Sequence, residues 1–195
     1  GLGDVYKRQP MNRLVQGDVG CGKTIVAALS ALQAVDSGYQ AALMAPTEIL
    51  AEQHFLKLKP LLEPLGVQVI LLIGSLRAKE KALRQEMVAS GQAQVVIGTH
   101  ALIQETVKFH KLGLSIVDEQ HRFGVEQRQT LIAKAPGADI LSMTATPIPR
   151  SLALARYGGL SLSYLHRPPA KQGGRTTKVC HFSEEGIAYD ACLLY

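Results

Sequence analysis

Residues Gly17 to Thr24 read GDVGCGKT, and this stretch decides how the rest of the chain is interpreted. It fits the phosphate-binding loop pattern, in which a glycine is followed, after four residues, by Gly-Lys-Ser/Thr. The run Asn12 to Gln16 predicts a short buried strand before the loop, and the Ala- and Leu-rich run Ile25 to Val35 predicts a helix after it. In this order, backbone N–H groups and the positive end of the helix dipole face phosphate oxygens. The pattern therefore predicts a nucleoside triphosphate site.

The individual positions of this loop have predicted roles in binding ATP. Lys23 is expected to bridge the β- and γ-phosphates, and the Thr24 hydroxyl is expected to ligate Mg²⁺. A glycine-rich turn that carries Lys-Thr by chance is the alternative, and the flanking strand and helix make it the less favoured one. The predicted nucleotide-binding residues are Gly17, Asp18, Val19, Gly20, Cys21, Gly22, Lys23 and Thr24.

Strands and helices alternate along the middle of the chain. Short apolar runs predict strands at Tyr39–Ala45, Val67–Ile73, Gln94–Gly98, Leu112–Asp118 and Ala138–Met143. Helices are predicted at Thr47–Leu62, with Thr47 as N-cap, at Arg77–Ser90 and at Val125–Lys134. Near-continuous Val, Ile and Leu is typical of strands that are buried on both faces. The expected fold class is therefore α/β, a P-loop NTPase with a parallel sheet covered by helices on both faces.

Two acids follow one of these strands directly. The apolar run Leu114 to Val117 leads into Asp118 and Glu119, which places both carboxylates at the carboxyl edge of the sheet, where ligands of open α/β folds bind. Asp118 is expected to hold Mg²⁺ through water, and Glu119 to orient and deprotonate the attacking water. A polar strand end that caps a following helix is the alternative, and the phosphate loop upstream makes it the less favoured one.

A later strand runs into TATPIPR, residues 144–150. The hydroxyls of Thr144 and Thr146 are expected to reach the neighbouring acidic strand end. An ordinary strand-to-helix turn produces the same pattern, so this motif decides little by itself.

Composition limits the kind of protein. The 195 residues are 47% hydrophobic, enough for a core, and their formal net charge of +5 favours a polyanionic partner. Three cysteines, Cys21, Cys180 and Cys192, form no close pair and no metal-ligand spacing, which favours a reducing compartment. No apolar run approaches the ~20 residues needed to cross a bilayer. We therefore expect a cytoplasmic protein without a membrane partner.

Five strings together resemble the motifs of superfamily-two helicases in order and spacing. They are GDVGCGKT, APTEILAEQ (45–53), GTHALI (98–103), DEQHRFGVEQR (118–128) and TATPIPR, and the match, from about residue 12 to 169, is closest to the RecG family of bacterial ATP-dependent DNA helicases. The resemblance implies a first RecA-like motor domain acting on branched DNA at replication forks and recombination junctions. Two alternatives stay open: the motor of a transcription-repair coupling translocase, and a nucleotide-binding module that is inactive in isolation.

The resemblance also implies roles for particular residues. Lys23 and Thr24 handle phosphate and Mg²⁺, Asp118 and Glu119 carry out hydrolysis, and His121 acts with Thr144 and Thr146 to couple the nucleotide state to DNA contact. A satisfied buried histidine is the alternative interpretation of His100. The residues expected to contact DNA phosphates from loops after strand ends are Pro46, Thr47, Glu48, Gly98, Thr99 and His100.

The domain organisation is predicted from the same resemblance. Residues 1–9, GLGDVYKRQ, have no continuity with the helicase-like sequence after them and are predicted to be a non-native leader. Residues 10–166 are predicted to be the motor domain. The segment 167–175, RPPAKQGGR, predicts a linker, and residues 176–195 would begin a second motor domain with a doubtful tail. A wedge domain upstream and the rest of the second motor domain downstream, with its arginine finger, are the expected partners in cis.

Overall fold

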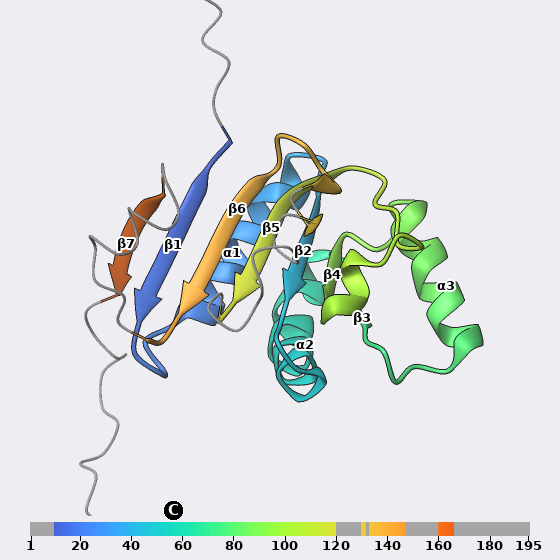
Figure 1. The fold of residues 1–195 in the computed structure, drawn as a ribbon, viewed down its shortest axis with the longest axis horizontal. Coiled ribbons are helices and arrows are strands. Elements are labelled where there is room, and N and C mark those ends of the chain that lie inside the picture. The colour runs from blue at the N-terminus through green and yellow to red at the C-terminus, as the bar shows by residue number, and fades with distance from the viewer. Residues whose placement is uncertain (1–9, 120–129, 132, 147–159, 166–195) are drawn as a thin grey trace, which may run out of the picture.

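A computed structural model describes residues 10–119, 130–131, 133–146 and 160–165 (Figure 1). The strands of this part of the chain form a parallel sheet in the order β3-β4-β2-β5-β6-β1-β7. The strands are β1 Asn12–Gly17, β2 Gln40–Met44, β3 Val69–Leu72, β4 Val95–Gly98, β5 Leu112–Asp118, β6 Asp139–Thr144 and β7 Ser161–Leu165. The predicted α/β class with a parallel sheet is confirmed.

The helices lie between the strands, as the sequence predicts. They are α1 Lys23–Asp36, α2 Glu48–Leu62 and α3 Ala78–Ala89, with short 3₁₀ helices at Glu63–Leu65 and His100–Ile103. Thr47 caps α2, because its side-chain oxygen accepts a hydrogen bond from Leu50 N at 3.3 Å. The helix predicted at Val125–Lys134 lies mostly outside the described residues, and within this range Thr130, Leu131 and Ala133 are helical.

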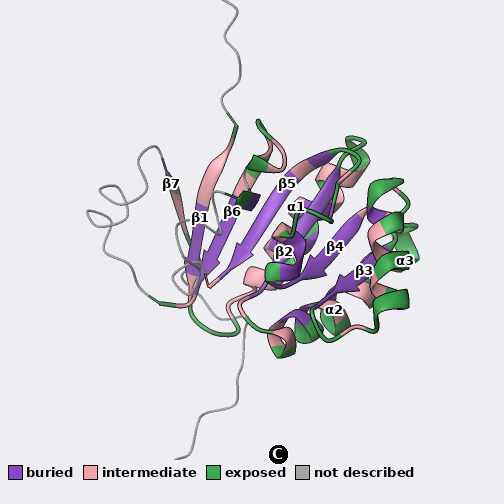
Figure 2. Ribbon diagram, turned by 45° about the vertical axis from the view of Figure 1, so that its right-hand side comes forward, coloured by how far each residue is buried: buried purple, intermediate pink, exposed green. Residues whose placement is uncertain are grey.

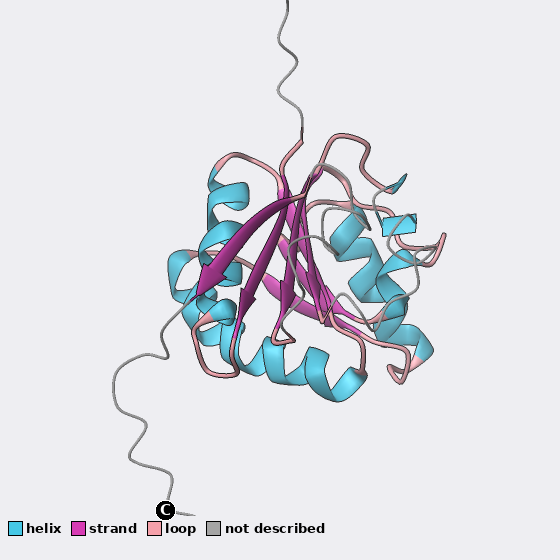
Figure 3. Cartoon of the chain, turned by 60° about the vertical axis from the view of Figure 1, so that its left-hand side comes forward, coloured by secondary structure: helices cyan, strands magenta, loops and turns pink. Residues whose placement is uncertain are grey.

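Helices cover both faces of the sheet (Figure 3). On one face, side chains of alternate strand positions such as Leu43, Ile97 and Ile116 pack against α1 and α2. On the other face, the neighbouring positions Met44 and Val117 pack with Val88 of α3 and with Leu131. Strands β2, β3 and β4 are buried at every position, and β5 and β6 over most of their length, which Figure 2 shows in purple. This burial explains their uninterrupted apolar sequences.

Strand β7 was not predicted. It pairs in parallel with β1, from Arg13 opposite Ser161 to Gly17 opposite Leu165, and forms one edge of the sheet (Figure 1). The alternation of leucine and serine in residues 160–163, LSLS, is the signal that marks such a half-buried edge strand. Because of β7, the strand that leads into the phosphate loop, β1, lies between two parallel strands, β6 and β7, rather than at the edge of the sheet.

No helix in the described part of the chain is long and apolar enough to cross a membrane.

Candidate nucleotide site

The three predicted catalytic segments follow three adjacent strands. β6 lies between β1 and β5 (Figure 1). Gln16 of β1 pairs with Thr144 of β6, and Met143 of β6 pairs with Asp118 of β5. Since all three strands are parallel, the phosphate loop, the threonine segment and the two acids share one carboxyl edge, as the sequence predicts.

The phosphate loop turns through glycines in the left-handed region. Gly20 has φ of 82° and Gly22 has φ of 100°, a conformation that side chains other than glycine rarely adopt. The turn is closed by Cys21 N, which donates to Asp18 O at 3.2 Å. Helix α1 begins at Lys23, and Gly22 at its N-cap supplies no side-chain hydrogen bond. The first N–H groups of α1 therefore carry no side-chain cap from Gly22 and suit an anion.

Lys23 folds back over this loop. Its Nζ donates to Gly17 O at 2.6 Å and to Asp18 O at 2.9 Å, and it lies 4.0 Å from Cys21 Sγ. Phosphate oxygens would replace these neutral carbonyl acceptors by charged ones, which form stronger hydrogen bonds with an ammonium group.

Gly17 allows a close approach between the loop and β7. A Cβ atom built there would lie 2.6 Å from Cys21 Sγ and 2.9 Å from Leu165 Cβ, closer than real Cβ atoms come to other atoms. The first glycine of the motif is therefore required by packing, and β7 supplies part of the wall beside the loop.

Asp118 is buried, and both oxygens of its carboxylate accept a hydrogen bond. Oδ1 accepts from Glu119 N at 3.0 Å, and Oδ2 lies 2.7 Å from Nε2 of His54 on α2. The backbone of Glu119 has φ of 48°, an unusual value for a residue with a side chain. Such outliers concentrate at functional sites, where the surrounding structure holds them.

The carboxylate of Glu119 crosses to the end of β6. Oε1 accepts from Ala145 N at 3.1 Å, and Oε2 accepts from Thr144 Oγ1 at 3.3 Å. Thr144 Oγ1 also lies 2.8 Å from Thr146 Oγ1. Thr144 thus reaches the acidic strand end as predicted, with Thr146 joined through it. His121 lies outside the described residues, so its predicted role stays a prediction.

The donor set suits Mg²⁺ only if a nucleotide completes it. The Thr24 hydroxyl and the Asp118 carboxylate are oxygen ligands of the kind that Mg²⁺ prefers. No group of three or more His, Cys, Asp or Glu among the described residues forms a metal cage. Mg²⁺ typically binds through one or two protein groups together with substrate phosphates, and the residues present fit that mode.

The residues predicted to contact DNA divide by exposure. Thr47 and His100 are exposed, which rules out the buried interpretation of His100, and Pro46 is half-buried. Thr99 is buried, with no hydrogen-bond partner for its Oγ1 among the described residues. A Cβ atom on Gly98 would lie 2.1 Å from Leu72 O, so close strand packing also explains this glycine.

Glu48 is engaged within the protein. Its Oε1 accepts from Ser75 N at 3.1 Å. Hydrogen bonding with Ser75 and Gly74, led by a side-chain hydrogen bond with Ser75, and the nearby His100 hold the pKa of this carboxyl below its ordinary value. Glu48 therefore ties the start of α2 to the loop after β3.

His54 is the residue of this site that sequence reasoning missed. The buried residues of α2 are Ala51, His54, Leu58 and Leu62, which form one stripe at helical spacing. A histidine on such an apolar stripe was the available signal, because a buried imidazole needs a polar partner.

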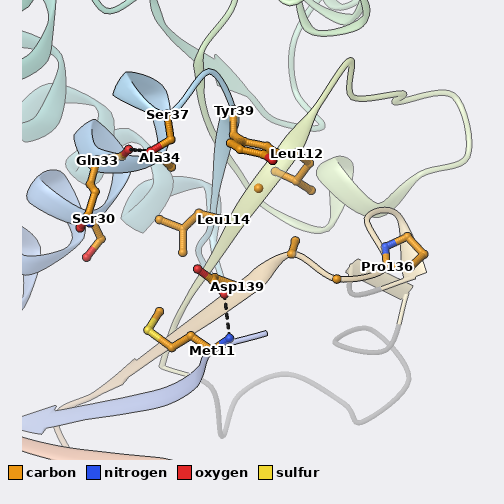
Figure 4. A pocket seen from close by; sticks show the side chains of 13 residues that line it. Met11, Ser30, Gln33, Ala34, Ser37, Tyr39, Leu112, Leu114, Pro136 and Asp139 are labelled. Atoms are coloured by element: carbon orange, nitrogen blue, oxygen red, sulfur yellow. Dashed lines mark hydrogen bonds between the residues drawn. The ribbon is translucent and has the colours of Figure 1, made fainter. Parts of the chain in front are cut away.

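A cavity of about 600 Å³ lies away from this site, at the amino edge of the sheet (Figure 4). Gln33 and Ser37 at the end of α1, Leu112 at the start of β5 and Asp139 at the start of β6 line it, and Asp139 Oδ1 accepts from Met11 N at 2.7 Å. None of the residues predicted to bind nucleotide or DNA lines this cavity.

Comparisons with known proteins agree with this geometry. A model of the DEAD/DEAH box helicase family matches residues 4–154. ATP-dependent DNA helicase RecG of Synechocystis is 52% identical over 179 residues, which cover 91% of this chain and 22% of that protein. RecG of Streptococcus pneumoniae is 54% identical over 169 residues, which cover 87% of this chain and 25% of that protein. The chain thus spans about a quarter of the length of these curated relatives.

Solved structures that resemble this chain are also helicases. A structure of RecG bound to a three-way DNA junction is 44% identical, with a TM-score of 0.74, and the match covers 93% of this chain and 24% of that one. A hypothetical ATP-dependent RNA helicase from Sulfolobus tokodaii, 17% identical with a TM-score of 0.63 over 79% of this chain and 48% of that one, shares the fold alone.

Proposed function

The chain belongs to the DEAD/DEAH box helicase family, and we propose that it is the ATP-binding motor domain of a DNA helicase or translocase acting on branched DNA. The intact protein would hydrolyse ATP to move on replication forks and recombination junctions during repair and recombination, in the cytoplasm. Two curated relatives named RecG, 52% and 54% identical, and the RecG structure with a three-way DNA junction support this choice. These similarities favour it over the transcription-repair coupling translocase.

One observation carries the proposal. The carboxylate of Glu119 is hydrogen-bonded to Thr144 Oγ1 and Ala145 N across the ends of β5 and β6, beside the strand that feeds the phosphate loop. A base for hydrolysis, a magnesium-type acid and a phosphate loop at one sheet edge form the constellation that NTP hydrolysis requires.

Each residue has a role in the proposed reaction. Backbone N–H groups of residues 17–24 bind the phosphates, and Lys23 Nζ moves from its carbonyl acceptors to the β- and γ-phosphate oxygens. Thr24 and Asp118 would hold Mg²⁺, which when bound neutralises charge that develops on the phosphates. Glu119 orients the attacking water and accepts its proton.

The threonine segment is proposed to couple ATP hydrolysis to DNA contact. The hydrogen bonds from Thr144 and Ala145 fix the orientation of the Glu119 carboxylate, so a displacement at the end of β6 changes where this base points. Thr146, joined to Thr144 by a hydrogen bond, shares this role, and the resemblance adds His121 to it.

DNA is proposed to lie along the loops after β2 and β4. These two strands are neighbours, so Thr47 and His100 are presented near each other at the carboxyl edge, together with the chain around Pro46 and Gly98. Contacts of backbone amides and hydroxyls with phosphates position DNA without reading its sequence, and the net charge of +5 favours them. A wedge domain and a second motor domain in cis would complete the DNA-binding machine.

ATP turnover by the intact protein, with and without a three-way DNA junction, tests the proposal. The parent is expected to show junction-stimulated hydrolysis. Glu119→Gln should still bind nucleotide yet lose hydrolysis, because an amide cannot accept the proton of water, whereas Lys23→Ala should weaken binding itself. Parental turnover by the Gln variant would refute Glu119 as the base. The same assay on the isolated 195-residue chain tests the alternative of a nucleotide-binding module that is inactive in isolation.

A further inference from the structure

His54 and Asp118 form a buried pair that joins two parts of the molecule. Nε2 of His54 lies 2.7 Å from Oδ2 of Asp118, with side-chain exposures of 11% and 12%. An ionised carboxylate only accepts hydrogen bonds, so Nε2 carries the hydrogen and donates it. The two residues come from α2 and from the end of β5, which are 64 positions apart in the sequence.

This contact is the one that explains a histidine on the buried face of α2. The neighbours of His54 along the stripe, Ala51 and Leu58, are apolar and buried. Placing an imidazole among them costs free energy unless it makes a hydrogen bond. Nδ1 of His54 is buried and has no partner among the described residues, so the bond to Asp118 is the only one the ring makes there.

The pair fixes the orientation of the Asp118 carboxylate. His54 holds Oδ2 and Glu119 N holds Oδ1, so each oxygen is engaged once. A carboxylate oxygen has two lone pairs, and one on each oxygen is left to accept hydrogen from a water molecule.

We propose that His54 is a positioning residue for Asp118, through which helix α2 controls the Mg²⁺ site. The proposal rests on the proposed function, since it requires Asp118 to serve a bound Mg–nucleotide. His54 does not touch the substrate. It sets the direction in which the carboxylate faces the nucleotide.

Helix α2 connects this contact to the proposed DNA surface. The helix starts at Glu48, directly after Pro46 and the N-cap Thr47, and His54 lies six positions further along. At 1.5 Å per residue the separation is about 9 Å, within one stiff hydrogen-bonded segment. A shift of the first turn of α2 when DNA binds is therefore carried to His54 and to the carboxylate it holds.

The Mg²⁺ concentration that half-saturates binding of a fluorescent ADP analogue to the intact protein tests this role without any hydrolysis. Loss of a partner that holds a metal-binding carboxylate typically weakens metal affinity 10–100-fold. His54→Leu is expected to raise the half-saturating concentration by about this factor and to lower the ratio of junction-stimulated to basal ATP turnover. His54→Gln, whose amide nitrogen has nearly the reach of Nε2, should restore most of both.

Two further variants separate the possible causes. Leu58→Ala, on the same buried stripe, should lower the melting temperature and leave the Mg²⁺ dependence at the parental value. Asp118→Asn should raise the half-saturating Mg²⁺ concentration at least as far as His54→Leu does. If it does not, the proposed nucleotide site is wrong. If Asp118→Asn has this effect while His54→Leu keeps the parental Mg²⁺ dependence and DNA stimulation, the role of His54 is refuted. Should His54→Leu fail to fold, equal behaviour of His54→Gln and the shorter His54→Asn refutes it instead.

Discussion

Glu48 shows how one side chain can link two loops at the carboxyl edge of the sheet. Its Oε1 accepts from Ser75 N, and this residue also begins α2, directly after the loop proposed to meet DNA. The carboxylate is therefore committed to an acceptor role inside the protein. In this arrangement Glu48 holds the loop that is proposed to meet DNA, and the exposed Thr47 stays available for that contact.

The hydrogen bonding of Glu48 has a consequence for acid stability. The pKa of the Glu48 carboxyl lies below its ordinary value of 4.5, mainly because of the side-chain hydrogen bond with Ser75. The folded state therefore favours the ionised form. The stabilisation is present above the pKa of the unfolded chain and is lost as pH falls through the lower folded value. Glu48→Gln should therefore lower the melting temperature at pH 7, with the difference from the parent shrinking below about pH 4.5. Glu52→Gln, on an exposed position of the same helix, should show no such trend.

A substitution of Thr144 tests how Glu119, the proposed base, is oriented. Thr144→Val removes the hydroxyl that donates to Glu119 Oε2, leaving only Ala145 N to hold that carboxylate among the bonds described above. A hydrogen bond to a charged group contributes about 1.5–3 kcal/mol, so we expect kcat to fall by about 10- to 100-fold with little change in nucleotide affinity. Thr144→Ser keeps the hydroxyl and should remain near the parental rate. A Val variant as fast as the parent would exclude this contact from the reaction.

At the scale of elements, most strands and helices follow from apolar patterning. The prediction of Leu112–Asp118 agrees with β5 at both ends, and Thr47–Leu62 differs from α2 only in counting the N-cap. The central strands are easy to predict from the sequence, because both of their faces are buried and their residues are therefore almost all apolar. The edge strand β7 was missed since Ser161 and Tyr164 face solvent and dilute the signal.

The residues of the candidate site likewise divide into those that the sequence predicts and those that only the structure reveals. Lys23, Asp118 and Thr144 stand in contiguous motifs, so their spacing along the chain identifies them. His54 has no motif of its own, because its significance comes from a contact across 64 sequence positions, and only the packing of α2 on β5 reveals it. Exposure also depends on tertiary structure, so the sequence could not decide whether His100 is buried or exposed.

Strand β4 approaches β3 so closely at Gly98 that the glycine should be irreplaceable for stability. An added Cβ would lie 2.1 Å from Leu72 O, a backbone atom of a neighbouring strand that cannot rotate away. Gly98→Ala is expected to destabilise the fold by about 1–3 kcal/mol, as measured by urea unfolding. Gly74→Ala is the comparison variant and should cost less, because its Cβ would meet a side-chain atom, Glu48 Oε1 at 3.0 Å, rather than a backbone atom. Equal stability of the two variants would contradict the close approach of these strands.

At the scale of the whole molecule, the predicted nucleotide-binding residues lie at one edge of the sheet, where β1, β6 and β5 end. The phosphate loop, Thr144 and the carboxylates of Asp118 and Glu119 lie together there, while the opposite edge carries the cavity between α1, β5 and β6. In the proposed reaction, the described residues supply the base Glu119, the phosphate loop and Asp118 as an acid suited to Mg²⁺. A further positive charge on the γ-phosphate is the contribution that the resemblance assigns to the second motor domain.

The isolated 195-residue chain should therefore separate nucleotide binding from turnover. We expect it to bind Mg–ATP weakly and to hydrolyse it barely above background, with or without branched DNA, because an arginine finger can contribute about 10³-fold or more to the rate. Equilibrium binding of a fluorescent nucleotide and steady-state phosphate release measure the two properties, and Lys23→Ala serves as the control that should lose both. The intact protein should recover DNA-stimulated hydrolysis. Robust strand separation by the isolated chain would show that this domain needs no second motor domain, and would refute the division of catalytic charge proposed for it.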